Sequence, residues 1–122
     1  MDTKKTLIVG ASTNADRFSY KAAKRLKENN HPIVLFGNKQ GEVAGETITN
    51  ELPSSIEGLD TITMYLSPEN QSEMTDKLIA LKPKRIIFNP GTENPSFMEK
   101  AQKNNIQVIA NCTLVMLSTD SY

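Results

Sequence analysis

Residues 10–14 of this 122-residue chain read Gly-Ala-Ser-Thr-Asn and are the clearest candidates for chemistry. They follow a short apolar run, residues 7–9, and precede an amphipathic segment, so they form a turn from a strand into a helix. Glycine allows a sharp turn, and the free N–H groups at the start of the next helix attract an anion. We predict a pyrophosphate site here, made by Gly10, Ala11, Ser12, Thr13 and Asn14. Because the G-x-G-x-x-G motif is incomplete, a tight turn that binds nothing is the alternative.

Arg17 stands close behind this turn and carries a charge suited to phosphate. A guanidinium can hold a phosphate through two parallel hydrogen bonds, and a charged hydrogen bond contributes about 1.5–3 kcal/mol. A surface arginine paired with Asp16 is the alternative interpretation. Ser19 follows where the helix should begin, and we expect it to cap that helix or to lie in its first turn. We include Ser19 among the cofactor-binding residues.

The end of the second apolar run, Ile33–Phe36, determines which nucleotide such a fold accepts. Nucleotide-binding folds usually place an acid here, and its carboxylate accepts hydrogen bonds from the ribose hydroxyls of NAD. This chain instead has Asn38 and Lys39, and a lysine attracts a ribose phosphate that a carboxylate would repel. The two residues therefore predict NADP or coenzyme A, which carry a 2′- or a 3′-phosphate. A lysine in a polar loop is the structural alternative.

Two further loops follow later apolar runs and should reach the same edge of the sheet. Ser67 and Pro68 follow one run, and Asn89-Pro90-Gly91 follows the next. Ligands of open α/β sheets bind at the carboxyl ends of the strands, close to the point where the strand order reverses. We therefore add Ser67, Pro68, Asn89 and Gly91 to the cofactor-binding residues, as a wall for the adenine or pantetheine portion. Ordinary loop structure is the alternative.

No catalytic residue and no set of metal ligands can be named from the sequence, because Asp and Glu are scattered without pairing. The single cysteine, Cys112, excludes an internal disulfide and a multi-cysteine metal site. If Asn111 caps the closing helix, Cys112 lies at a helix N-terminus, which favours a thiolate. A redox or mixed-disulfide role therefore stays open beside that of a buried cysteine. His31 precedes the second run, at the opposite edge of the sheet, so a Cys–His pair is not expected.

The overall composition is that of a folded globular chain, with 38% hydrophobic and 23% charged residues. Basic and acidic residues balance at 14 each, so we expect no nucleic acid and no membrane surface as a partner. The first residues lead directly into a strand-length run, far short of a signal-peptide core, and no run approaches membrane-spanning length. We expect a cytoplasmic protein with a small-molecule nucleotide ligand. The sequence specifies no oligomeric state.

Five apolar runs must position these residues, and none of them alternates with polar residues. Such runs are typical of parallel strands covered on both faces, and their spacing of roughly 22 to 30 residues suits βαβ units. Ser67-Pro68 and Asn94-Pro95 mark helix starts, and Asn29-Asn30 marks a helix end. We predict one α/β domain over residues 1–122, a three-layer sandwich with a mostly parallel sheet of five to six strands. The runs are residues 7–9, 33–36, 62–66, 86–88 and 108–110.

Residues 37–60 are the exception, because they contain Gly41 and Gly45 and show no long helical pattern. We expect a loop here, then a short strand near Glu46–Thr49 and a turn of helix near residues 54–58. These elements replace the full crossover helix of a standard βαβ unit.

Together these motifs resemble those of the small bacterial CoA-binding domain proteins, a family similar to the N-terminal domain of the succinyl-CoA synthetase α subunit. The resemblance covers roughly residues 5 to 117. It implies a Rossmann-like CoA-binding fold in which the first turn holds the pyrophosphate and Lys39 lies near the ribose 3′-phosphate. The loops at Ser67 and Asn89 would line the rest of the groove. The motifs are Val9-Gly10-Ala11-Ser12, Arg17-Phe18-Ser19-Tyr20, Phe36-Gly37-Asn38-Lys39, Val43-Ala44-Gly45, Phe88-Asn89-Pro90-Gly91 and Asn111-Cys112.

The chain departs from the family's pattern at three places. Phe18 follows the arginine where the family usually has proline, and Gly37-Asn38-Lys39 replaces an Asn-Pro or Ser-Pro pair. Ile87-Phe88-Asn89-Pro90 stands where the family typically has Trp-x-Gln. The synthetase's catalytic phosphohistidine belongs to a second domain, so the resemblance does not extend to ligase activity.

These observations predict a stand-alone protein that binds coenzyme A or an acyl-CoA without catalysis of its own. Two alternatives stay open. An NADP-dependent oxidoreductase shares the phosphate argument, although no catalytic Tyr-Lys or His-Asp arrangement is evident. An interaction module that kept the fold and lost nucleotide binding is the other.

Overall fold

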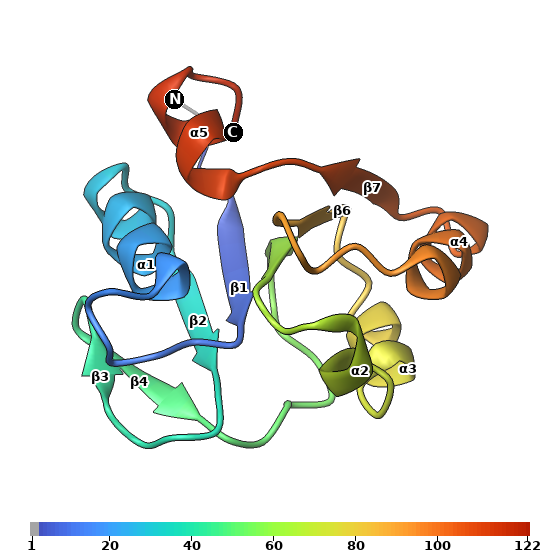
Figure 1. Cartoon of the computed structure of the whole chain (residues 1–122), viewed down its shortest axis with the longest axis horizontal. Helices are drawn as coiled ribbons and strands as arrows, with labels where there is room; N and C mark the ends of the chain where they lie inside the picture. Colours follow the sequence, from blue (N-terminus) through green and yellow to red (C-terminus); the bar gives the residue numbers. More distant parts are fainter. Residues whose placement is uncertain (1–2) are drawn as a thin grey trace.

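A seven-stranded sheet lies between two layers of helices in the computed structural model, which describes residues 3–122 (Figure 1). The strand order is β3-β4-β2-β1-β5-β6-β7, and neighbours run parallel except β3, which is antiparallel to β4. The strands are β1 (Lys5–Val9), β2 (Ile33–Phe36), β3 (Glu42–Val43), β4 (Glu46–Thr49), β5 (Leu59–Met64), β6 (Arg85–Phe88) and β7 (Gln107–Ala110). The helices are α1 (Phe18–Glu28), α2 (Pro68–Gln71), α3 (Thr75–Ala80), α4 (Pro95–Lys103) and α5 (Thr113–Ser118). The predicted α/β class is confirmed, with a slightly higher strand count.

The central strand β1 is buried on both faces, which explains its uninterrupted apolar sequence. Leu7 and Val9 contribute to one hydrophobic core, and Ile8, between them, contributes to the other. This division follows from the alternation of side chains along a strand.

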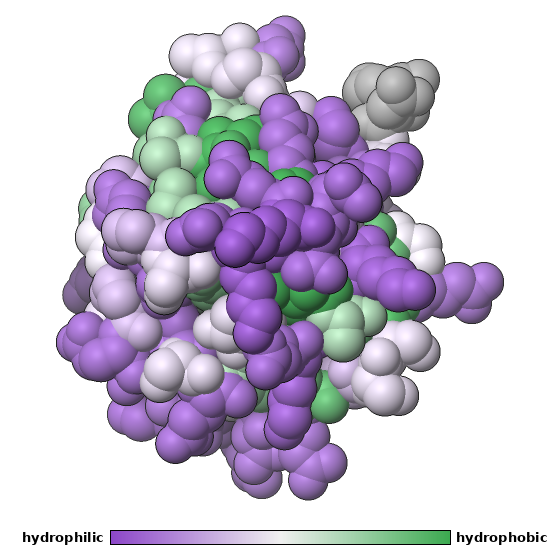
Figure 2. All heavy atoms as spheres, turned by 90° about the vertical axis from the view of Figure 1, so that its right-hand side faces the viewer, coloured by the Kyte–Doolittle hydropathy of each residue, from purple (hydrophilic) through white to green (hydrophobic). Residues whose placement is uncertain are grey.

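Each core is closed by a different set of helices. Helices α1 and α5 cover one face of the sheet, where Leu26 and Leu117 pack with Ile8. Helices α3 and α4 cover the other face, where Leu78 and Phe97 are fully buried. Figure 2 shows that the outer surface on the right of Figure 1, over α3 and α4, is largely hydrophilic. Within residues 3–122, none of the helices is both long enough and apolar enough to cross a membrane.

The region between β2 and β5 forms a small hairpin in place of a crossover helix. The predicted short strand is confirmed as β4, and β3 is the additional strand that pairs with it. Ala44 and Gly45 connect the two with φ angles of 54° and 84°, the left-handed conformation that a tight two-residue hairpin turn requires. The expectation of a turn of helix at residues 54–58 is wrong. No helix forms there, and the chain makes only a turn at Glu57 and Gly58 before β5.

Two boundaries differ from the sequence pattern in ways that shape the site. Strand β5 ends at Met64, so Tyr65 and Leu66 of the predicted run leave the sheet and turn toward its carboxyl edge. The helix that begins after Ser67 divides into α2 and α3 around a turn. The buried side chain of Gln71 bonds to loop carbonyls where α2 ends, and this anchors the break.

The strand order reverses beside β1. The chain proceeds from β1 outward to β2 and β4, and then crosses back to add β5 on the other side of β1. Loops that follow β1 and β5 therefore separate at this point and leave a crevice at the carboxyl edge, as in other open α/β sheets.

Candidate functional site

A pocket of about 350 Å³ opens at this point, where β1, β2 and β5 end. It is lined by residues 10–14, 17–19 and 36–39, together with Tyr65 and Leu66. The structure therefore brings together most of the predicted cofactor-binding residues from separate parts of the chain. Those that line the pocket are Gly10, Ala11, Ser12, Thr13, Asn14, Arg17, Ser19, Asn38 and Lys39.

The turn after β1 is fixed by hydrogen bonds that use two of its N–H groups. Gly10 has a φ of 98°, and a Cβ there would lie 3.2 Å from the side chain of Leu66. The N–H groups of Gly10 and Ala11 both donate to the carbonyl of Phe36 at 2.9 Å. These two groups hold β1 and β2 together, so they are not available to an anion.

The N-terminus of α1 offers donors instead. The first hydrogen bond of this helix runs from the Lys21 N–H to the carbonyl of Arg17, its N-cap residue, at 3.2 Å. Within the described chain no side chain caps this end, and no acidic residue lies in its first turn. The leading N–H groups of a helix have no partner inside the helix. The helix thus presents uncompensated donors and the positive end of its dipole beside the pocket.

Ser19 lies in the first turn of α1 rather than at its N-cap, and it is buried. Ser12 and Asn14 shape the loop before the helix. The Ser12 Oγ accepts a hydrogen bond from the Asn14 N–H at 3.0 Å, and the Asn14 Oδ1 accepts one from the Asp16 N–H at 2.9 Å. These bonds leave the Ser12 hydroxyl proton and the Asn14 amide protons for other acceptors.

The loop after β2 packs directly on the loop after β1. A Cβ at Gly37 would lie 2.4 Å from the carbonyl oxygen of Ala11, and one at Gly41 would lie 2.3 Å from the side chain of Thr13. Only glycine permits such close approach. The contact brings Asn38 and Lys39 into the lining of the same pocket as the start of α1.

The electrostatic character of the pocket is positive. Arg17 and Lys39 supply its charges, and the described residues that line it include no carboxylate. Both side chains are exposed, and among residues 3–122 neither forms an ion pair. Two unpaired cations and an uncapped helix N-terminus suit a ligand with several phosphate charges.

Four predicted residues lie at the same edge but outside the pocket lining: Ser67, Pro68, Asn89 and Gly91. Ser67 is the N-cap residue of α2, its Oγ accepts a hydrogen bond from the Asn70 amide at 2.9 Å, and Pro68 follows as the first helical residue. Both come directly after Leu66, which does line the pocket. Gly91 is exposed, and its N–H donates to the Glu93 carboxylate at 2.8 Å.

Asn89 has a scaffolding role that the sequence did not reveal. It is 3% exposed, and its amide nitrogen donates to the Thr63 hydroxyl and to the Met64 carbonyl, each at 2.8 Å. Its Oδ1 accepts the N–H of Thr113, the first residue of α5, at 2.8 Å. Both amide protons form hydrogen bonds within the protein, so the side chain has no free donor for a ligand. It connects β5, β6 and α5.

Gln71 is a second buried amide that sequence reasoning missed. Its nitrogen donates to the carbonyls of Leu66 and Thr92 at 2.9 and 2.8 Å, and its oxygen accepts from the Asn94 amide at 3.0 Å. It therefore fixes the loops after β5 and β6 to each other. Asn94 also caps α4, as its position before Pro95 predicted, but no local pattern marks Gln71 as buried.

Tyr65 forms part of the pocket wall, and its phenol is buried on the side of α5. Burial raises the pKa of Tyr65 to about 12, so this hydroxyl stays protonated. Cys112 is itself the N-cap residue of α5, which corrects the expectation that Asn111 would cap this helix. The Asn111 Oδ1 instead accepts the Cys112 N–H at 2.7 Å. Cys112 is not among the residues that line the pocket.

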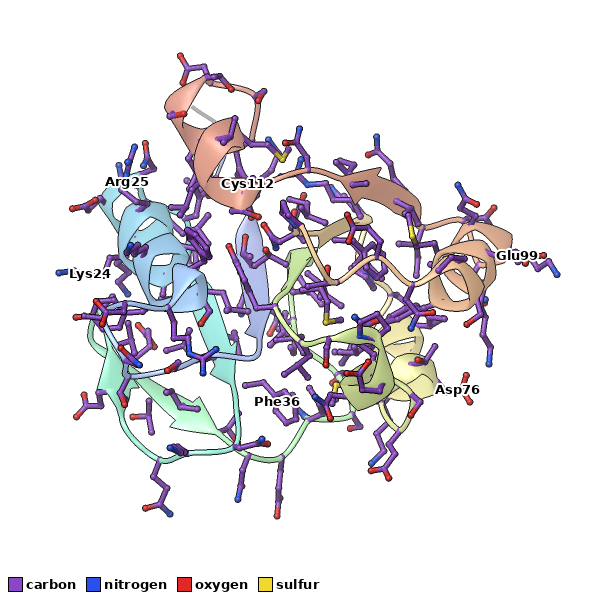
Figure 3. The ribbon with its side chains drawn as sticks, viewed as in Figure 1. Lys24, Arg25, Phe36, Asp76, Glu99 and Cys112 are labelled. Atoms are coloured by element: carbon purple, nitrogen blue, oxygen red, sulfur yellow. The ribbon has the colours of Figure 1, made fainter. Side chains whose placement is uncertain are left out.

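A second hollow of about 390 Å³ adjoins the pocket at Phe36. Figure 3 shows the Phe36 side chain between the end of β2 and helix α2, well away from Cys112. Leu52 and Met74 give this hollow apolar walls, and Glu51 and Glu73 lie at its margin. The two hollows together give a long ligand room to extend across the carboxyl edge.

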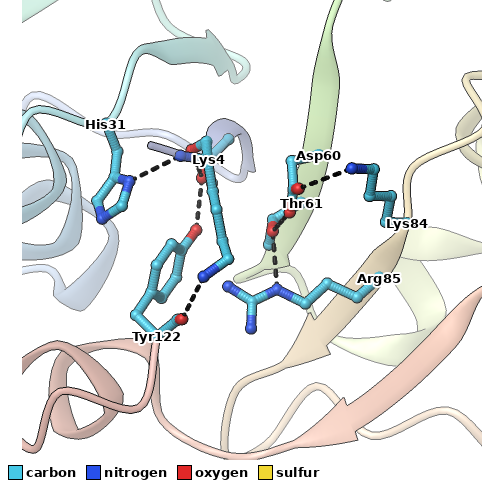
Figure 4. A network of polar contacts seen from close by, with 8 residues as sticks. Lys4, His31, Asp60, Thr61, Lys84, Arg85 and Tyr122 are labelled. Atoms are coloured by element: carbon cyan, nitrogen blue, oxygen red, sulfur yellow. Dashed lines mark hydrogen bonds and ion pairs between the residues drawn. The ribbon is translucent and has the colours of Figure 1, made fainter. Parts of the chain in front are cut away.

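The opposite edge of the sheet carries a network of polar side chains (Figure 4). His31 lies at this edge, as its position before β2 predicted. It is buried, and its Nδ1 accepts the Lys4 N–H at 2.9 Å. The Tyr122 ring packs against the His31 ring in a tilted arrangement, with ring centres 4.9 Å apart, and the Tyr122 hydroxyl is hydrogen bonded to Thr6. The Arg85 guanidinium lies 4.5 Å from the centre of the Tyr122 ring. Among residues 3–122, no cluster of His, Cys, Asp or Glu is arranged to hold a metal ion.

A family model described as a CoA binding domain matches residues 4–118. The chain belongs to the CoA-binding domain family. As a member of this family, it has a general role in binding coenzyme A, a small-molecule ligand. A search of curated proteins gives no match.

Solved structures support the fold of this CoA-binding domain. A crystal structure of an uncharacterized protein is 48% identical over 100% of both chains, with a TM-score of 0.96. The structure of cell-free ID.343 from Thermus thermophilus is 19% identical, covers 98% of this chain and 91% of that chain, and has a TM-score of 0.87. A hypothetical protein from Pyrococcus horikoshii OT3 is 22% identical, with coverages of 96% and 83% and a TM-score of 0.86.

Proposed function

We propose that this CoA-binding domain binds coenzyme A or an acyl-CoA in the pocket at the carboxyl edge and works as a binding protein without catalysis of its own. The supporting observation is the presence of two cations, Arg17 and Lys39, in the lining of a pocket whose described residues include no carboxylate. Coenzyme A carries a pyrophosphate and a separate 3′-phosphate, so its charges are distributed over two places as the cations are.

Each cation has a distinct role in this proposal. The pyrophosphate lies at the uncapped N-terminus of α1 and pairs with Arg17, where the helix dipole adds to the charge of the side chain. Lys39, on the loop after β2, binds the 3′-phosphate of the ribose. The remainder of the ligand extends past Leu66 toward Ser67 and the second hollow.

The test is calorimetric titration of the purified protein with coenzyme A, dephospho-CoA, NADP and NAD under reducing conditions. Preference for coenzyme A over dephospho-CoA supports the assignment of the 3′-phosphate to this pocket. Preference for NADP instead favours the oxidoreductase hypothesis, and binding of none of the four favours an interaction module.

Replacing Lys39 with Ala tests the assignment of the second phosphate. We expect coenzyme A affinity to fall about tenfold or more, given about 1.5–3 kcal/mol for a charged hydrogen bond, while dephospho-CoA affinity changes little. Lys103→Ala is the matched control, because Lys103 lies on α4 and pairs with Glu99. Equal weakening of coenzyme A and dephospho-CoA would contradict the role given to Lys39.

A further inference from the structure

Phe18 is an aromatic side chain with no part in the proposed binding of the two phosphate groups. It is the first residue of α1, follows Arg17 directly and lines the pocket. It is 65% exposed and is one of two exposed large hydrophobic residues in the described chain. The other is Val115, on α5. A single exposed apolar residue needs no explanation, but an exposed ring in the wall of a polar, cationic pocket does.

The Phe18 ring is held from one side by a cation. The Lys21 Nζ lies 5.5 Å from the ring centre, one helical turn further along α1. A lysine over one face of an aromatic ring is attracted by the electron density of that face and restricts the motion of the ring. Because the side chain is 65% exposed, part of the ring surface remains available to a flat partner.

The other aromatic residues of the pocket are already engaged in packing. Phe36 packs against the core that contains Leu7, and Tyr65 packs against the core that contains Ile8. Phe18 is not part of either core. Of the three aromatic side chains in the pocket wall, Phe18 is therefore the one whose ring surface is available to contact a ligand.

We propose that Phe18 is the stacking platform for the adenine base of the bound nucleotide. This inference rests on the proposed function and specifies which part of the ligand the mouth of the pocket recognises. Adenine is the planar π group of coenzyme A, and aromatic side chains stack on bases without needing hydrogen bonds. The pantetheine arm has no such group. Recognition of the base thus adds to the binding of the two phosphate groups.

The test uses two fragments of coenzyme A as separate ligands. The wild-type protein and Phe18→Leu are titrated with 3′,5′-ADP, which contains the base, and with 4′-phosphopantetheine, which does not. Leucine keeps an apolar side chain at the helix start but removes the π face. We expect Phe18→Leu to bind 3′,5′-ADP about 5- to 100-fold more weakly, from the usual effect of removing one stacked aromatic, and to bind 4′-phosphopantetheine normally.

Two controls separate stacking from a general effect on the site. Phe18→Tyr keeps the ring and should keep wild-type affinity for 3′,5′-ADP. Val115→Ala removes the other exposed hydrophobic side chain and should change neither fragment's affinity. In proton NMR, the adenine H2 and H8 signals of bound 3′,5′-ADP should shift upfield in the ring current of Phe18, and Phe18→Leu should abolish the shift.

The possible failures are distinguishable. If the wild type binds coenzyme A but Phe18→Leu binds 3′,5′-ADP equally well, the stacking role is overturned and the proposed function stands. Equal weakening of both fragments also overturns it, because the ring would then act on the site as a whole. If the wild type binds neither coenzyme A nor 3′,5′-ADP, the proposed function fails and the stacking role fails with it.

Discussion

The two edges of the sheet use their polar side chains in opposite ways. At the carboxyl edge, Arg17 and Lys39 are exposed and form no ion pair within residues 3–122. At the amino edge, Lys4, His31 and Tyr122 bond to one another or to the strands (Figure 4). The difference shows that a binding site needs donors left without partners, whereas a stabilising network needs donors with partners.

Asn89 tests this comparison most strongly, because it lies at the carboxyl edge yet is fully bonded internally. Asn89→Ala leaves the N–H of Thr113 and the carbonyl of Met64 without their partner. We expect the free energy of unfolding to fall by about 3 kcal/mol and the Tm by roughly 10 °C. Thermal unfolding followed by circular dichroism measures this. A loss below about 1 kcal/mol would show that the buried network contributes little.

Replacing one arginine at each edge with alanine compares how much the two edges contribute to stability. Arg85 is 8% exposed, its Nε donates to the Thr61 hydroxyl at 2.8 Å, and its guanidinium packs on Tyr122. Arg85→Ala should lower the free energy of unfolding by about 2–3 kcal/mol, because it leaves a cavity in a packed region. Arg17→Ala should change it by less than about 0.5 kcal/mol, as is usual for exposed side chains.

For coenzyme A affinity we expect the reverse order, with the larger loss in the Arg17 variant. Arg17→Ala should weaken coenzyme A binding by about 10- to 100-fold, and Arg85→Ala should leave it within about twofold. If Arg85→Ala does not fold, Arg85→Met keeps the volume of the aliphatic stem and allows the same titration. A strong effect of Arg85→Met on coenzyme A affinity would break the comparison, because it would place a binding role at the amino edge.

The smallest expected effect is a pH dependence at the amino edge. Burial, reinforced by the charges of Lys4 and Arg85, lowers the pKa of His31 below its ordinary 6.5 despite the nearby Asp60. As the pH falls below about 6.5, the unfolded chain takes up a proton that the folded protein does not, so stability decreases. His31→Asn, which retains an acceptor for the Lys4 N–H, should remove this part of the pH dependence.

Urea unfolding of both proteins at pH 7.5 and pH 5.5 provides the measurement. The wild type should lose more stability than the variant over this interval, since ordinary Asp and Glu carboxylates titrate mainly below it. The same dependence in both proteins would contradict the assignment to His31.

Much of the fold could be predicted because it depends on local chemistry. The uninterrupted apolar runs predicted buried parallel strands, and the Asn94-Pro95 pair marked the start of α4. The division between α2 and α3 could not be predicted, because the Gln71 side chain at the end of α2 bonds to loop carbonyls that the local helical pattern does not reveal. The partner of the first N–H of α5 could not be predicted for a related reason: it is Asn89, 24 residues away.

The sequence by itself determined the strand and helix types, the glycine turn after β1 and the positive charge at the end of β2, since each depends on neighbouring residues. Only the tertiary structure decided which of these groups are free to act. In the folded chain, the N–H groups of Gly10 and Ala11 both donate to the Phe36 carbonyl, and the side chain of Asn89 is buried. Arg17 and Phe18 stay exposed in the pocket that Lys39 also lines. Whether a donor keeps or loses its capacity for a ligand depends on partners distant in the chain, and these meet only when the sheet forms.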